Sequence, residues 1–111
     1  MPEYTPMPEP WEPAVATRAI NHLANAMGMR FVMKKHALAR EDLRGIITTD
    51  ILHILKTGFV YREHENATRP NYFKYQIEGR SPNSGNRIIR LCVIPDEKNV
   101  GIKVVTVMWV D

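Results

Sequence analysis

Residues 87–110, RIIRLCVIPDEKNVGIKVVTVMWV, decide the fold class of this chain. They contain two apolar runs, 87–94 and 102–110, in which β-branched residues are frequent, and this composition is typical of strands. The stretch between them, 95–101, contains Pro, Asp, Asn and Gly and indicates a turn. A connection this short favours antiparallel pairing, and the two most apolar strands of the chain are expected at the centre of a sheet.

The same period of two occurs upstream, over residues 59–65 and 72–78, with turn residues at 66–71 and 79–86. The four runs together predict a four-stranded antiparallel meander. Alternation places one set of side chains on the core face: Phe73, Tyr75, Ile77, Ile89, Leu91, Val93, Val105, Val107 and Trp109. The opposite face would carry Lys74, Gln76, Arg90 and Thr106. Such a polar, partly cationic face suits RNA, although an ordinary solvated sheet face has the same composition.

Helices are expected in the first half of the chain. Residues 14–28 carry apolar side chains at helical spacing, with Gly28 at the end: Ala16, Ile20, Leu23, Ala24 and Met27. A second helix is expected from the cap Thr48-Thr49-Asp50 to Gly58, and a short third one over 36–45. Residues 31–33 are expected to be a short extended link. The predicted fold is α+β, with two to three N-terminal helices packed on one face of a four-stranded antiparallel sheet.

Residues 1–13 contain five of the eight prolines and predict an extended arm outside a single folded domain, residues 14–111. Few backbone groups of such an arm can join a helix or a sheet, so its removal is expected to leave folding intact. Trp11 is the side chain of the arm best suited to contact the core.

Composition narrows the functional classes. The single cysteine, Cys92, excludes an internal disulfide, and the absence of a long apolar stretch or secretory signal predicts a cytoplasmic protein without a membrane span. The four histidines lack the spacing of a zinc site, so neither a metal nor a cofactor is expected. The net charge is +3, but residues 14–111 carry all 15 basic residues against 9 of the 12 acidic ones. This excess favours a partner that carries phosphates.

The candidate site begins with His36-Ala37-Leu38-Ala39-Arg40-Glu41-Asp42-Leu43-Arg44-Gly45-Ile46. On a helix, His36, Arg40 and Arg44 fall on one face, and Gly45 suits the left-handed residue that ends it. A titratable imidazole beside two permanent cations suits the binding or cleavage of a phosphodiester. A solvated basic helix face has the same spacing, and spacing alone favours that plainer interpretation.

The motif His-Ala-x-x-Arg-x-x-x-Arg-Gly-Ile, the capped helix ending in Lys56-Thr57-Gly58 and the closing Val104-Val105-Thr106-Val107 resemble a bacterial domain-of-unknown-function family over residues 36–109. That family is grouped with the RelE-like and BrnT-like toxins, among the metal-independent ribonucleases that include barnase and the colicin tRNases. The resemblance implies a RelE-like fold and a toxin-type endoribonuclease that leaves 2′,3′-cyclic phosphate ends.

The resemblance also implies roles for individual residues. His36 would be the acid or base, with Arg40 and, more weakly, Arg90 as the other catalytic groups. Arg44 of the motif would bind the substrate, together with Lys74 and Thr106, which the predicted sheet register places on the polar face. No Glu–His pair of the barnase kind is evident, so the general base is not identified.

Two functions follow, with different partners. An endoribonuclease would act on RNA and would have a cognate antitoxin or another protein as its regulator. A non-catalytic module with the same fold would only bind protein or nucleic acid, because a fold does not by itself specify an activity. Recognition of double-stranded DNA is disfavoured, since no helix shows the spacing of a recognition helix preceded by a turn.

Overall fold

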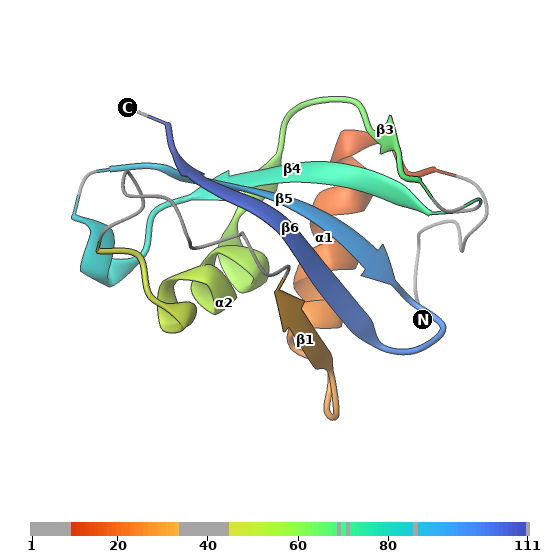
Figure 1. Cartoon of the computed structure of the whole chain (residues 1–111), viewed down its shortest axis with the longest axis horizontal. Helices are drawn as coiled ribbons and strands as arrows, with labels where there is room; N and C mark the ends of the chain where they lie inside the picture. Colours follow the sequence, from red (N-terminus) through yellow and green to blue (C-terminus); the bar gives the residue numbers. More distant parts are fainter. Residues whose placement is uncertain (1–9, 34–44, 69, 71, 86, 111) are drawn as a thin grey trace.

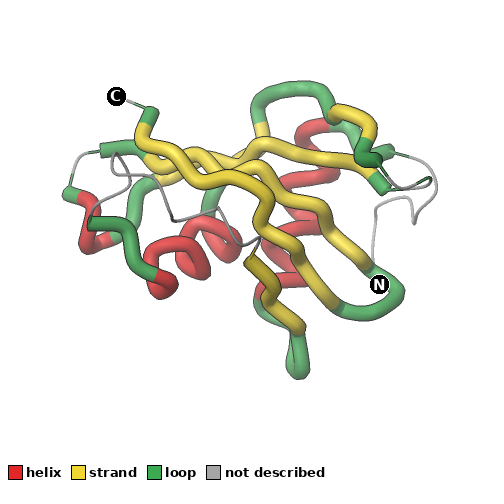
Figure 2. The backbone as a smooth tube through the Cα atoms, viewed as in Figure 1, coloured by secondary structure: helices red, strands yellow, loops and turns green. Residues whose placement is uncertain are grey.

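In the part of the chain that the structure describes, two α-helices cover one face of a six-stranded mixed sheet (Figures 1 and 2). The computed structural model describes residues 10–33, 45–68, 70, 72–85 and 87–110. The elements, in chain order, are α1 (Pro13–Ala24), β1 (Arg30–Met33), α2 (Thr48–Thr57), β2 (Phe59–Val60), β3 (Glu65–Asn66), β4 (Phe73–Gly79), a 3₁₀ turn η2 (Pro82–Ser84), β5 (Ile89–Asp96) and β6 (Gly101–Trp109). No helix among these residues is long and apolar enough to cross a membrane.

The α+β class is confirmed, but the predicted four-stranded antiparallel sheet is wrong in part. The strand order is β1-β6-β5-β4-β2, and β3 pairs with β4 beside this path. β1 runs parallel to β6, with Arg30 opposite Gly101 and Met33 opposite Val104, where an extended link was expected. The expected strand 59–65 is instead two short strands, and β2 and β3 pair with different parts of β4.

An irregularity in β6 reverses the side-chain alternation. Cys92 of β5 lies opposite Thr106, but the next residue, Val93, lies opposite Val104. Val105 is therefore the extra residue of a β-bulge. Val104 is completely buried and Val105 is only half-buried, so Val105 is not the core residue that strict alternation predicted.

The rest of the predicted core face is confirmed. Completely or almost completely buried are Tyr75, Ile77, Ile89, Leu91, Val93 and Val107. Phe73 and Trp109 are partly buried and pack against this cluster. The helices contribute the other half of the core through Ile20, Ile51 and Ile54, which are fully buried between helix and sheet.

Helix α1 begins with Pro13 in its first turn and ends at Ala24, earlier than the expected Gly28. Met27 lies beyond the helix and is 99% exposed, so its predicted place on the apolar face is wrong. Two polar side chains of α1 are used for packing. The Nδ2 of Asn21 donates to the carbonyl of Leu55 at 2.8 Å, and the hydroxyl of Thr17 accepts from the backbone N–H of Val60 at 2.8 Å. α1 is thereby bonded to α2 and to β2.

Trp11 belongs to the folded body. Its side chain is 2% exposed, its ring stacks on that of Tyr75 with centroids 5.6 Å apart, and its backbone N–H donates to the Tyr75 hydroxyl at 2.8 Å. The packed part of the chain therefore starts by residue 11, inside the segment that the proline content assigned to the arm. Residues 1–9 lie outside the described residues.

Candidate functional site

The outer face of the sheet, opposite α1 and α2, carries the polar residues that alternation assigned to it. Strands β4, β5 and β6 contribute alternate side chains to this face: Lys74, Gln76, Glu78, Arg90, Cys92, Ile94, Lys103, Val105, Thr106 and Met108. Lysine and arginine thus occur on several neighbouring strands. The outer face is the part of the described fold where cations and polar groups gather.

Arg90 is committed to an ion pair. Arg90 and Glu78 lie directly opposite each other on β5 and β4, and the Arg90 Nε donates to the Glu78 Oε2 at 2.6 Å. The two side chains are only 21% and 16% exposed. A phosphate would have to compete with Glu78 for this guanidinium, so Arg90 is a weaker candidate for catalysis than the sequence indicated.

Cys92 lies between Gln76 and Thr106 in the next row across the outer face. Burial raises the pKa of the Cys92 thiol; the nearby Lys74 charge and the Thr106 hydroxyl lower it only in part, and the Glu65 charge adds to the rise. The sulfur is therefore a neutral thiol near pH 7, which makes it a poor nucleophile. The role of Thr106 visible here is its hydrogen bond to this thiol.

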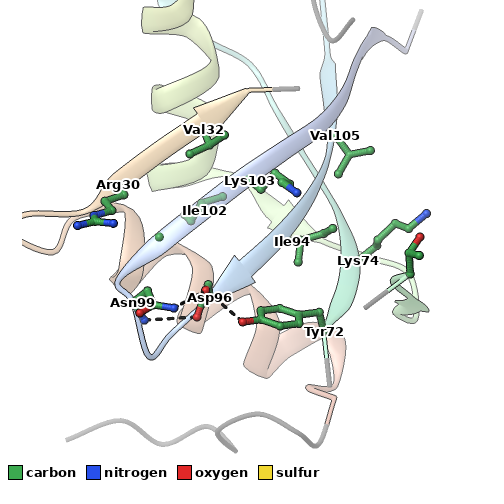
Figure 3. A pocket seen from close by; sticks show the side chains of 12 residues that line it. Arg30, Val32, Tyr72, Lys74, Ile94, Asp96, Asn99, Ile102, Lys103 and Val105 are labelled. Carbon is green, nitrogen blue, oxygen red and sulfur yellow. Dashed lines mark hydrogen bonds between the residues drawn. The ribbon is translucent and has the colours of Figure 1, made fainter. Parts of the chain in front are cut away.

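A hollow of about 340 Å³ opens on the outer face where β1, β6, β5 and β4 lie side by side (Figure 3). We call it the outer-face hollow. Three kinds of side chain line it. The cations are Arg30, Lys74 and Lys103; the apolar residues and glycine are Val32, Ile94, Gly101, Ile102 and Val105; the other polar residues are Thr68, Tyr72, Asp96 and Asn99. Among the residues that the structure describes, none of the three cations is ion-paired.

Asp96 organises the polar end of the hollow. Its carboxylate accepts a hydrogen bond from the Tyr72 hydroxyl at 3.3 Å, and from the Asn99 side-chain amide and backbone N–H at 2.8 and 3.3 Å (Figure 3). The one carboxylate of the described lining is thus already hydrogen-bonded within the protein. The volume is near the lower end for small-molecule sites, which typically run from about 300 to 1,000 Å³.

The predicted site residues have different outcomes. His36, Arg40 and Arg44 lie outside the described residues; Gly45, directly after them, has the left-handed φ of +91° that was expected for the end of the motif. Lys74 lines the outer-face hollow, whereas Arg90 and Thr106 lie elsewhere on the same face.

The structure adds Arg30 and Lys103 to Lys74, and sequence reasoning missed both. Lys103 is separated from Val105, Val107 and Trp109 by even numbers of positions, so strict alternation would place its side chain on the core face with theirs. The bulge at Val105 turns it to the outer face instead. Arg30 reaches the hollow because β1 pairs with β6, and no local pattern indicated that pairing. The one signal in the sequence was the position of Lys103 inside a strongly apolar strand, where a lysine side chain is expected to face solvent.

Two further titratable side chains of the described residues, His64 and Tyr75, pack inside the fold. His64 packs edge-on against Phe73 with ring centroids 5.3 Å apart. Burial raises the pKa of Tyr75, which is 1% exposed and hydrogen-bonded to Trp11, so Tyr75 is no acid catalyst. Across the described ranges, no three His, Cys, Asp or Glu side chains are grouped so that they could hold a metal ion.

Comparison with known proteins gives one family. Residues 33–109 match the family described as a domain of unknown function, DUF4258. The match contains the whole 36–46 motif, α2 and all the strands from β2 to β6. Neither a curated protein nor a solved structure matches the chain.

Proposed function

The chain belongs to the DUF4258 family of domains, and from its site we propose that it is a metal-independent endoribonuclease of the toxin type. The observation that carries this proposal is the gathering of Arg30, Lys74 and Lys103 around one hollow on the outer face, without a carboxylate paired to any of them in the described part of the chain. Cations that are not ion-paired within the protein are available to phosphates. A cytoplasmic location, where RNA is the abundant polyphosphate, is part of the proposal.

The proposed reaction is a transesterification within the RNA chain. The ribose 2′-oxygen loses its proton to a base and attacks the adjacent phosphorus, and the bond to the 5′-oxygen breaks as an acid protonates that oxygen. The products are a 2′,3′-cyclic phosphate and a free 5′-hydroxyl. His36 is the proton-transfer group of this proposal, Arg40 stabilises the charge on the phosphorus oxygens, and Arg44, Lys74 and Thr106 bind the RNA.

The test compares purified wild type with His36→Ala on total RNA in the presence of a metal chelator. A positioned acid or base typically contributes about 10²- to 10⁴-fold, so the substitution should remove most cleavage while the melting curve changes little. Arg40→Lys should also reduce cleavage, because lysine lacks the planar fork that holds two phosphate oxygens. End-group analysis should detect cyclic phosphates. Unchanged cleavage by a folded His36→Ala protein would refute the mechanism.

The second candidate is a non-catalytic module that binds RNA or a protein such as an antitoxin. The 2.6 Å pair between Arg90 and Glu78 favours it, because it occupies one of the cations on which the catalytic interpretation depends. The two functions are separated by one experiment. A wild-type protein that binds RNA but cleaves none under any ionic condition is the module and not the enzyme.

A further inference from the structure

We propose that the outer-face hollow holds one nucleotide, either free or as an unpaired nucleotide of an RNA chain. The base would lie against its apolar lining, and the phosphate between its lysines. In its RNA form this inference rests on the proposed function and deepens it. In its free form it stands even if the protein cleaves no RNA.

Strand register arranges the lining in a row across the sheet. Lys103 of β6 lies opposite Val32 of β1 on one side and Ile94 of β5 on the other. Because Tyr75 lies opposite Val93 in the antiparallel pair, Lys74 is the neighbour of Ile94. The row therefore alternates apolar, cationic, apolar, cationic, and Glu65 of β3 lies opposite Lys74 at its end. Neighbouring strands are about 4.8 Å apart, so the two lysine backbones lie roughly 10 Å apart, with Ile94 between them.

This spacing suits a ligand with one apolar, planar part and one anionic part. Two flexible lysine stems at this separation can both reach a phosphate placed above Ile94. The neighbouring apolar side chains are accessible to a base, since Val32 is 51% exposed and Val105 is only half-buried. Apolar contact with a few placed polar groups is typical of small-molecule sites, and bases bind protein largely through their faces.

The polar end of the hollow is already fixed before a ligand arrives. Asp96 holds the hydroxyl of Tyr72 and both donors of Asn99, so the tyrosine ring borders the hollow in one orientation (Figure 3). The backbone N–H of Arg30 donates to the carbonyl of Val100 at 2.8 Å, which holds the start of β1 against the β5–β6 turn. A rigid border reduces the ordering cost of binding.

The charged residues that line the hollow indicate whether its ligand is an anion or a cation. Arg30, Lys74 and Lys103 face one lining carboxylate, Asp96, whose oxygens accept three hydrogen bonds within the protein. The described lining is thus net positive and favours an anion. A plain anion would leave the apolar side chains of the row in water, whereas a nucleotide covers them.

The experiment follows backbone amide signals of the ¹⁵N-labelled full chain during titration with adenosine 5′-monophosphate, ribose 5-phosphate and adenosine. The monophosphate should shift signals in 30–33, 72–74 and 94–103 and should bind more tightly than either fragment. Lys103→Gln and Lys74→Gln should each weaken its binding by about 3- to 10-fold, whereas Lys56→Gln, on the exposed side of α2, should leave it unchanged. Melting curves check that each variant is folded.

A single-stranded 2′-O-methyl RNA, which cannot be cleaved because it lacks the attacking hydroxyl, separates the two sources of the nucleotide. Tighter binding than the monophosphate at the same amides assigns the hollow to RNA, and equal binding assigns it to a free nucleotide. Ribose 5-phosphate binding as tightly as the monophosphate, or shifts confined to other residues, would overturn the inference. Absence of cleavage refutes only the ribonuclease proposal, since these titrations need no catalysis.

Discussion

Asp50 is a buried carboxylate that joins the start of α2 to the turn after β4. It is 2% exposed and accepts hydrogen bonds from the Ile47 backbone N–H at 3.0 Å, the Ser81 hydroxyl at 2.5 Å and the Asn83 amide at 3.2 Å. Burial by itself raises the pKa of Asp50, but these three hydrogen bonds and the nearby His53 outweigh it and hold the pKa below its ordinary value. Asp50 is therefore ionised in the folded protein. It lies in the first turn of α2, whereas the sequence placed it in the cap before that helix.

We expect Asp50→Asn to lower the free energy of unfolding by about 1–3 kcal/mol at neutral pH, because an amide places a donor against groups that themselves donate. The folded-state pKa lies below the ordinary value of 3.8, so the carboxylate stabilises the protein above that pH and loses this effect as the pH falls through the folded pKa. The difference between wild type and Asp50→Asn should therefore shrink in acid. Urea denaturation at several pH values measures it, with the exposed Glu12→Gln as control; a difference independent of pH contradicts this account.

The pair between Glu78 and Arg90 is the second residue-scale prediction. Glu78→Gln frees the Arg90 guanidinium on the outer face, so binding of uncleavable RNA should tighten by roughly 2- to 5-fold. Fluorescence anisotropy gives the affinity. Glu63→Gln removes the same charge from an exposed residue and serves as the matched control. Equal affinities for the two variants would show that Arg90 takes no part in RNA binding even when it is released.

Among the elements, the start of α1 depends on Trp11. We expect Trp11→Ala to cost about 3–5 kcal/mol of unfolding free energy, because it empties the space beside Tyr75 and leaves a buried ring without its stacking partner. Deleting residues 1–9 should change the melting temperature little, in keeping with their proline content. A Trp11→Ala protein that melts with the wild type would show that Trp11 is not needed to hold the start of α1 against the core.

On the scale of the whole molecule, the positive outer face predicts salt-dependent RNA binding. If Arg30, Lys74 and Lys103 neutralise three phosphates, the logarithm of the association constant should fall by about 2 for each decade of salt on a single strand. Lys103→Gln should reduce that slope by about 0.7, whereas Lys56→Gln should leave it unchanged. A flat response of the wild type would exclude phosphate contacts and leave a protein-binding module.

Local periodicity predicted the parts of the site that lie on regular strands. Lys74 on β4 and Arg90 on β5 were assigned correctly to the outer face, because each strand alternates without interruption there. Lys103 was not predicted for the outer face, because alternation counted from Val107 and Trp109 would turn it inward, and the bulge at Val105 turns it outward. The partner of Arg90 was not predicted either, since the pairing of Glu78 with Arg90 depends on the register across the turn between β4 and β5.

The sequence by itself determined the α+β class, the two amphipathic helices, the central position of β5 and most of the core side chains. These features depend on periods of two and of 3.6 residues, which each segment carries alone. The tertiary structure decided the parallel pairing of β1 with β6, the burial of Trp11 and the convergence of Arg30, Lys74 and Lys103. Each of these joins residues far apart in the chain, and the free energy of such contacts resides in the pair and in neither segment separately.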